Sequence, residues 1–408
     1  MVSGNRHTGK TTDGPTPRVP GSRTHLHAPA RRLGNPGFAA MQAFIYTTLP
    51  ARVVFGQGTL ARVGDEVRRL GGGRALVLST PQQIGEARAL AERLGPLAAG
   101  VFAEAAMHTP TDVTERGLAR VRELGADCLV ALGGGSTTGL GKAIALRTDL
   151  PQVVIPTTYA GSEATPILGE TEDGRKTTLR SPKVLPEVIV YDVDLTLTLP
   201  AKLSVTSGIN AIAHAVEALY AEEANPVVSM LAEAGIAALA RALPRIAADP
   251  RDREARSDAL YGAWACGTCL GSVGMALHHK LCHVLGGSFD LPHAETHTVV
   301  LPHAAAYNAP AASGAMACVA KVLGTSADGA AQGLFDLARD LGAPTSLREI
   351  GMPEDGLDRA ADLAAASPYW NPRPIGRTAV RALLQAAYDG SPPRVSSLPA
   401  FPTETAHA

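Results

Sequence analysis

Histidines recur at helical spacing in the second half of the chain. Asn210 and His214 are four residues apart, so on one helix they share a face. His279 and His283 repeat that spacing, and His293 follows in a DLPHAE turn. Imidazoles from two helices and a turn can converge on one divalent cation or on one anionic substrate. A single buried histidine is usually a satisfied core residue, whereas four on apolar segments favour a site.

A glycine loop could bind phosphate. Gly133, Gly134, Gly135 and Ser136 follow the apolar strand DCLVAL and precede the helical run TGLGKAIAL. Glycines let backbone N–H groups approach a phosphate, and a helix N-terminus adds positive potential. The loop matches neither G-x-G-x-x-G nor the P-loop, so a plain turn is an equal alternative. We interpret it as a candidate cradle for the diphosphate of a dinucleotide.

Hydroxyl side chains leave the next apolar strand. Thr157, Thr158 and Ser162 belong to the segment PTTYAGSEAT, which begins at the end of the strand predicted at 152–158. The carboxyl ends of parallel strands are where α/β sheets bind ligands, so these hydroxyls suit a nucleotide or a substrate. A helix start capped by serine or threonine is an alternative that is compatible with this role.

Two kinds of pattern must position these groups. Up to about residue 199, apolar strands alternate with amphipathic helices, which predicts βαβ units and a parallel sheet covered by helices. The predicted strands are 74–80, 98–104, 127–135, 152–158 and 186–192. Beyond Pro200 long Ala/Leu-rich helical segments follow, one of them continuous over 255–287. The predicted fold class is therefore an α/β dinucleotide-binding domain followed by an all-α domain.

Composition shifts set the expected domain limits. Residues 1–40 hold few aliphatic residues and many of Gly, Pro, Thr and Arg, which predicts a disordered extension. We expect the α/β domain at 41–199, the helical substrate and metal-site domain at 200–395, and a flexible tail at 396–408. The site should lie in the cleft between the two domains.

Charge and cysteine content narrow the partners. A net charge of -1, from 37 basic and 38 acidic residues, gives no field for nucleic acid or anionic lipid, so a small molecule is expected. Five cysteines in apolar sequence do not form a secreted disulfide framework, which favours the cytoplasm. Cys266 and Cys269 form a CxxC without a second pair, which favours helix packing over a metal. No apolar run reaches the ~18 residues of a membrane helix.

The order of these motifs resembles the iron-containing alcohol dehydrogenases. Four motifs follow one another between about Met41 and Asn371. They are GGGS, then PTT with GSE, then a helix with Asn210 four residues before His214, and then H-x3-H-x9-H. The resemblance implies a dehydroquinate synthase-like architecture, NADH or NADPH as cofactor, and Fe or Zn in the cleft. It also implies hydride transfer between nicotinamide and a carbonyl or alcohol, and a homodimer.

Carried onto this chain, the resemblance implies specific site residues. His214, His279 and His293 would be metal ligands, with Asn210 in place of the family's Asp, and His283 would lie near the nicotinamide and the substrate. Gly133, Gly134, Gly135, Ser136, Thr157, Thr158 and Ser162 would bind the cofactor.

Two departures resemble the maleylacetate reductase branch of that family. Gly139 occupies the position of an Asp in the GGGSxxDxAK pattern, and Asn210 replaces the metal-binding Asp. A neutral amide should weaken metal binding, but it makes the pocket more positive, which suits a substrate with two carboxylates.

This branch implies conjugate reduction of maleylacetate to 3-oxoadipate in the degradation of aromatic compounds. Substituted maleylacetates are further expected substrates. His214, His279 and His293 would stabilise the enolate oxygen, as imidazole or imidazolium, and His283 would deliver a proton. Candidate partners for the substrate carboxylates are Lys142, Arg175, Lys176 and Lys280. The alternatives are a metal-dependent alcohol or aldehyde dehydrogenase, and a catalytically silent nucleotide-binding protein.

Overall fold

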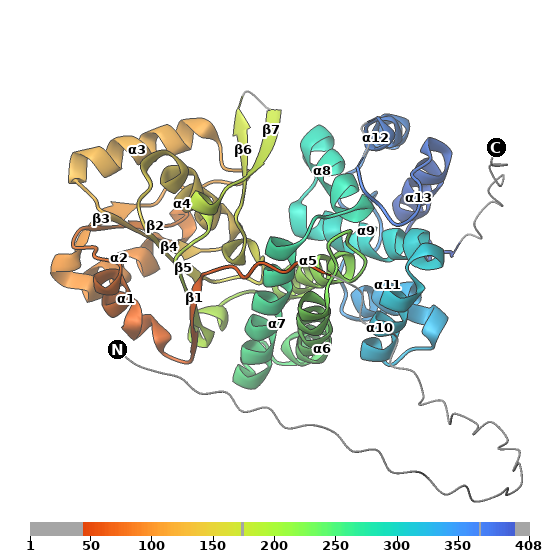
Figure 1. The fold of residues 1–408 in the computed structure, drawn as a ribbon, viewed down its shortest axis with the longest axis horizontal. Coiled ribbons are helices and arrows are strands. Elements are labelled where there is room, and N and C mark those ends of the chain that lie inside the picture. Colours follow the sequence, from red (N-terminus) through yellow and green to blue (C-terminus); the bar gives the residue numbers. More distant parts are fainter. Residues whose placement is uncertain (1–43, 173–174, 367–368, 396–408) are drawn as a thin grey trace, which may run out of the picture. The chain divides into compact units, whose positions relative to one another are not determined.

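The computed structural model describes residues 44–172, 175–366 and 369–395. The predictions for residues 1–40 and 396–408 lie outside these ranges. The described chain begins with a parallel sheet and continues into helices, as Figure 1 shows. The predicted fold class is therefore confirmed.

The first half is built on one six-stranded parallel sheet in the order β1-β8-β5-β4-β2-β3. Its strands are β1 (Arg52–Gly56), β2 (Ala75–Leu78), β3 (Ala98–Phe102), β4 (Cys128–Gly133), β5 (Gln152–Pro156) and β8 (Val188–Asp192). Gly133 at the end of β4 is paired with Pro156 at the end of β5. This register brings the glycine loop and the PTT segment to the same edge of the sheet.

Helices cover both faces of this sheet. They are α1 (Val63–Arg69), α2 (Ile84–Leu94), α3 (Thr111–Leu124) and α4 (Gly135–Thr148). Val77 packs in the same core as α1 and α2, whereas its neighbours Leu76 and Leu78 pack in the core with α3 and α4. Because successive side chains on a strand point to opposite faces, a strand buried on both faces is apolar throughout. This explains the continuous apolar runs of the sequence.

The second half is helical over the described residues. Its helices are α5 (Ala201–Leu219), α6 (Pro226–Ala248), α7 (Arg253–Ser272), α8 (Leu277–Phe289), α9 (His293–Asn308), α10 (Ser313–Leu323), α11 (Ala330–Asp340), α12 (Gly356–Ala365) and α13 (Arg377–Asp389). By length and composition α6 could cross a membrane. In the fold it packs against α5 and α7, and many of its side chains are buried in the core of the helical half.

Two features differ from the sequence prediction. Along the chain, β5 is followed by an antiparallel hairpin of β6 (Ile167–Glu172) and β7 (Arg175–Arg180), which precedes β8. No strand was predicted there. The segment 255–287 is two helices, α7 and α8, which meet at an angle of 96°. Apolar periodicity continues through that bend, so the sequence pattern does not reveal it.

Candidate active site

One cavity of about 810 Å³ is lined by both halves of the described chain. Gly135 and Ser136 of the glycine loop belong to its wall, and so do the candidate ligands Asn210, His214 and His279. His283 and His293 complete the predicted histidines on the same wall. The glycine loop and the histidine cluster therefore share one space.

The glycine loop is tightly constrained. Gly133 has a φ of 154°, and a Cβ there would lie 2.3 Å from the Thr137 hydroxyl. A Cβ on Gly134 would lie 2.9 Å from the methyl group of Thr158. Gly135 is the first residue of α4, where backbone N–H groups lack partners within the helix. The first two glycines thus permit the close turn, and Gly135 and Ser136 place the N-terminus of α4 on the cavity wall.

The predicted hydroxyls divide into two groups. Thr158 and Ser162 line the cavity. Thr157 is buried, and its hydroxyl accepts a hydrogen bond from Gln83 Nε2 at 3.2 Å. Thr157 therefore fastens the loop to its neighbour and is not among the residues that line the cavity.

The structure explains why glycine occupies position 139. A Cβ on Gly139 would lie 2.3 Å from Oγ1 of Thr109. Thr109 and His108 both have left-handed backbones, with φ of 48° and 63°, and both line the cavity. Strained residues of this kind persist only where their surroundings hold them, and they concentrate at functional sites. The loop before α3 thus fills the space where the family pattern has an Asp.

His214 and His279 form the centre of the histidine cluster. His214 Nδ1 and His279 Nε2 are 2.8 Å apart. The outer nitrogen of His214 donates to the Ala160 carbonyl at 3.2 Å, and the outer nitrogen of His279 donates to the Glu217 carboxylate at 2.7 Å. Both outer partners are acceptors, so the outer nitrogens carry the protons.

The inner nitrogens of His214 and His279 therefore both direct lone pairs into one space. Two such nitrogens need either a shared proton or a cation between them, and the residues fit the divalent metal that the resemblance implies. Asn210 adds support, because its Oδ1 is buried without a hydrogen-bond partner among the described residues. Asn210 lies one helical turn before His214 on α5.

Burial decides the protonation of these rings. Desolvation, with His279 next in effect, lowers the pKa of His214 well below its usual value. The same causes lower the pKa of His278, and for His297 burial acts first and His293 second. A charged imidazolium at His214 is therefore disfavoured at neutral pH, and a neutral N–H donor or metal ligand is the form to expect.

His283 and His293 lie at the open side of the cluster. Both are exposed and line the cavity. The ring of His283 lies 6.4 Å from that of His279, between centroids. His293, predicted in a turn, is the first residue of α9, and its ring lies 4.4 Å from that of His297. His293 and His283 can thus contact a ligand in the cavity.

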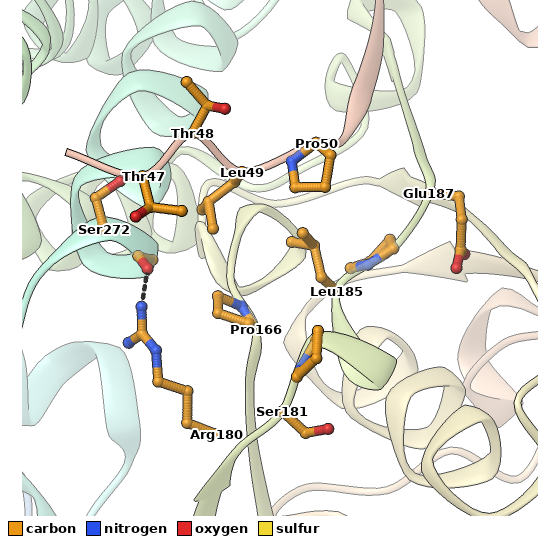
Figure 2. A pocket seen from close by; sticks show the side chains of 13 residues that line it. Thr47, Thr48, Leu49, Pro50, Pro166, Arg180, Ser181, Leu185, Glu187 and Ser272 are labelled. Atoms are coloured by element: carbon orange, nitrogen blue, oxygen red, sulfur yellow. Dashed lines mark hydrogen bonds between the residues drawn. The ribbon is translucent and has the colours of Figure 1, made fainter.

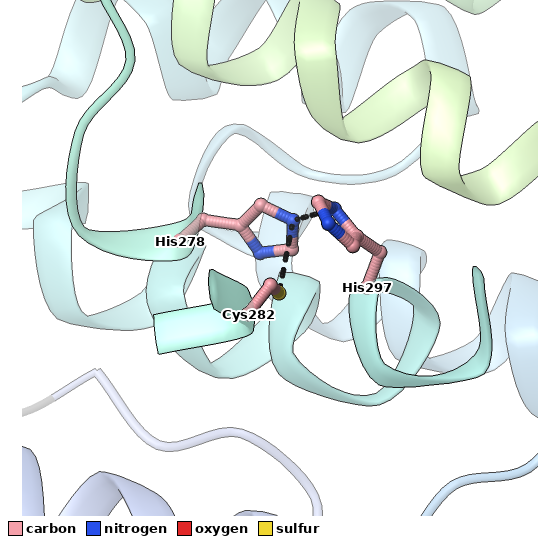
Figure 3. Close-up of side chains that lie close together, drawn as sticks. All are labelled: His278, Cys282 and His297. Atoms are coloured by element: carbon pink, nitrogen blue, oxygen red, sulfur yellow. Dashed lines mark hydrogen bonds between the residues drawn. The ribbon is translucent and has the colours of Figure 1, made fainter. Parts of the chain in front are cut away.

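His278, Cys282 and His297 form a buried triad (Figure 3), and the ring centroid of His278 lies 5.1 Å from that of His279. Nε2 of His278 lies 2.9 Å from Nδ1 of His297 and 3.8 Å from Sγ of Cys282. Among the described residues, this triad is the group whose metal-binding atoms all lie within 4.8 Å of one another. Burial raises the pKa of the Cys282 thiol well above its usual value, so the thiol is neutral. The triad is thus a hydrogen-bonded core that supports α8 and α9 beneath the site.

The predicted carboxylate partners are placed differently from one another. Lys142 is fully buried, and its ammonium group donates to the carbonyls of Ser162, Thr165 and Ile167. It therefore secures the segment that enters β6. Lys280 lies 5.5 Å from the ring centroid of Tyr369 and is absent from the cavity wall. The side chains of residues 175 and 176 lie outside what the structure describes.

Arg180 is a cation that the sequence analysis missed. It ends β7, lines the cavity, and donates from Nη2 to the carbonyl of Gly271 (Figure 2). It also borders a second hollow of about 660 Å³ beside the extended segment 47–50. Among the described residues, the cavity wall contains one lysine, Lys142, and one arginine, Arg180. The ammonium group of Lys142 is already bound to backbone carbonyls.

Two further residues escaped prediction. Glu217 is completely buried on α5 and binds His279, yet its position in an apolar run gave no sign of that contact. His297 follows His293 by four residues, so the spacing could have marked it. The CxxC cysteines, Cys266 and Cys269, are buried and unpaired, as helix packing predicts.

Family models match most of the described chain. Residues 50–193 match the model of iron-containing alcohol dehydrogenase, and residues 204–388 match the C-terminal model of the Fe-containing alcohol dehydrogenase family.

Individual relatives agree. The chain is 62% identical to a maleylacetate reductase of Rhizobium sp. strain MTP-10005, over 86% of this chain and all of that protein. It is 58% identical to a maleylacetate reductase of Sphingobium indicum, over 86% of this chain and 99% of the relative. The crystal structure of maleylacetate reductase from Agrobacterium tumefaciens superposes with a TM-score of 0.84 at 61% identity, covering 86% of this chain and all of the other.

Proposed function

The chain belongs to the iron-containing alcohol dehydrogenase family, and on that premise we propose that it is an NAD(P)H-dependent maleylacetate reductase. It reduces the conjugated C=C bond of maleylacetate to give 3-oxoadipate. The observation that carries the proposal is the single cavity that joins the glycine loop to the histidine cluster, in a chain 62% identical to a maleylacetate reductase.

The glycine loop positions the cofactor. N–H groups at the start of α4, from Gly135 and Ser136, bind the diphosphate, and Thr158 and Ser162 contact the nucleotide further along the cavity. Nicotinamide, when bound, supplies a hydride to the β-carbon of the enone. The cofactor is NADH or NADPH.

The histidine cluster handles the charge that develops on the substrate. Reduction turns the ketone of the enone into an enolate, whose oxygen needs donors or a cation. His214, His279 and His293, with Asn210, would hold a divalent metal, Fe or Zn, which when bound polarises that oxygen. His283, exposed at the open side of the cluster, delivers the proton that completes the saturated product.

Arg180 binds a substrate carboxylate. A dicarboxylate needs cationic partners, and Arg180 is the guanidinium on the described cavity wall. Its planar group can hold a carboxylate through two parallel hydrogen bonds. The neutral Asn210 adds no repulsion, in contrast to the family's Asp.

We further propose that the enzyme acts in the cytoplasm as a homodimer and accepts substituted maleylacetates. The deciding experiment measures oxidation of NADH and of NADPH with maleylacetate, with and without added Fe²⁺ or Zn²⁺, beside a panel of short aldehydes. Turnover of maleylacetate supports the proposal. Turnover of aldehydes alone would favour an alcohol or aldehyde dehydrogenase, and cofactor binding without turnover would favour a silent nucleotide-binding protein.

A further inference from the structure

We propose that Glu217 is a positioning residue, which holds the ring of His279 so that its Nε2 lone pair faces the reacting end of the cavity. The inference deepens the proposed function and rests on His279 taking part in it. Glu217 lies on α5 with none of its side chain exposed, and it reaches across to α8. A buried carboxylate is costly unless several donors satisfy it, so its contacts reveal its purpose.

One purpose is structural. Glu217 accepts hydrogen bonds from the backbone N–H groups of Ala276 at 2.9 Å, His278 at 2.8 Å and His279 at 3.3 Å. These N–H groups belong to the start of α8, where a helix cannot supply their partners. Glu217 is therefore a cap for α8 that comes from another helix, and it stabilises the 96° bend between α7 and α8.

The second purpose concerns the ring. Oε2 of Glu217 lies 2.7 Å from Nδ1 of His279. A carboxylate can only accept, so Nδ1 must carry a ring proton, and in the neutral ring Nε2 then carries the lone pair. That nitrogen faces His214 Nδ1 at 2.8 Å. The same carboxylate thus fixes where α8 starts and which nitrogen of His279 is available to a cation.

The chain offers a matched control for the structural purpose. Glu223 accepts a hydrogen bond from the N–H of Gly274 at 3.0 Å, in the same bend, and this carboxylate makes no hydrogen bond to a histidine ring among the described residues. Glu223→Gln therefore weakens the capping of the bend and leaves the His279 ring bond intact. Glu217→Gln affects both, because a neutral amide must either turn a donor toward Nδ1 or offer it a weaker acceptor.

The experiment compares both variants by kcat, by KM for NADH, by Co²⁺ affinity and by urea unfolding. Loss of such a partner typically lowers metal affinity or activity by about 10- to 100-fold. We expect Glu217→Gln to lose kcat and Co²⁺ affinity on that scale with KM for NADH unchanged, whereas Glu223→Gln loses only stability. In a His279→Ala background, Glu217→Gln should cause no further loss of kcat. An equal loss in that background would overturn the proposal, since Glu217 would then act only as a cap.

The unsubstituted protein gives a readout that needs no substrate. With ring-¹⁵N-labelled histidine, nuclear magnetic resonance distinguishes a protonated Nδ1 from a protonated Nε2. We expect His279, assigned by its absence in His279→Ala, to be protonated at Nδ1. Protonation at Nε2 would overturn the role of Glu217. If maleylacetate is not turned over at all, the proposed function fails, while this measurement still decides the position of the ring proton.

Discussion

Alanine at position 139 should destabilise the protein, even though alanine normally favours a helix over glycine. Gly139 lies inside α4, where Gly→Ala contributes about 1 kcal/mol of helix stability. Its Cβ, however, would lie 2.3 Å from Thr109 Oγ1, and overpacking of a closed site costs about 1–3 kcal/mol. The clash outweighs the gain, so we expect Gly139→Ala to lower the free energy of unfolding by about 1 kcal/mol.

Removing the threonine hydroxyl should reverse the sign. In a Thr109→Ala background the clashing atom is absent, and Gly139→Ala should then raise the free energy of unfolding by about 1 kcal/mol. The two sites should therefore be coupled by about 2 kcal/mol. Gly85→Ala in α2 is the control, because nothing lies within 4 Å of its Cβ, and it should stabilise in either background.

Urea unfolding of the four combinations measures this coupling, and KM for NADH reports whether the His108–Thr109 loop moves. If Gly139→Ala stabilises the wild-type protein, or if Thr109→Ala leaves its cost unchanged, then packing against Thr109 is not the reason for glycine at 139.

Three further predictions concern metal, substrate and pH. Asn210→Asp should raise Co²⁺ affinity, measured by calorimetry, at least 10-fold, because it adds a charged oxygen donor beside His214. It should also raise KM for maleylacetate. An unchanged Co²⁺ affinity would place residue 210 outside the donor set. Arg180→Gln should raise KM for maleylacetate by about 10- to 100-fold with KM for NADH unchanged, as expected for losing a charged hydrogen bond, whereas the exposed Lys183→Gln should change neither. Burial lowers the pKa of His303 from 6.5 to about 4, so the unfolded chain takes up a proton first as pH falls, and stability should decline between pH 6.5 and 4. At pH 5 this amounts to about 2 kcal/mol, and His303→Gln should remove that part of the decline in urea unfolding at pH 5 against pH 7.5; an unchanged decline would assign it to other groups.

Periodicity was enough to predict the sheet and the helical half. Val77 and its neighbours on β2 are apolar because both faces of the strand are covered, and this pattern is local. The sequence also indicated that the glycine loop and the PTT segment each follow a strand of this sheet, but the pairing of Gly133 with Pro156 comes from the structure. The histidine spacing predicted that His279 and His283 share a helix face, and their rings do lie 6.4 Å apart.

What the sequence could not provide depends on contacts between distant segments. The bend between α7 and α8 is stabilised by Glu217 and Glu223, which lie 50 to 60 residues earlier, and nothing near Ala276 announces it. The β6–β7 hairpin carries charged residues in place of the apolar alternation that marks a strand, so Arg180 was not placed on a cavity wall. Long-range contacts of this kind are absent from any local pattern.

The departures at positions 139 and 210 share an electrostatic effect. Each replaces a family carboxylate by an uncharged residue, in a cavity where a dicarboxylate must approach a dinucleotide diphosphate. At an effective dielectric of 20, two like charges about 6 Å apart repel by about 3 kcal/mol, which is roughly a 100-fold change in affinity. Removing either carboxylate therefore favours a dianionic substrate, and at position 210 it does so at the expense of metal affinity. Asn210 retains an unpartnered oxygen toward the His214 side of α5, so the chain keeps a weaker cation site without the repulsive charge. The neutral amide of Asn210 thus explains both why the cluster still resembles a metal site and why its substrate can carry two carboxylates.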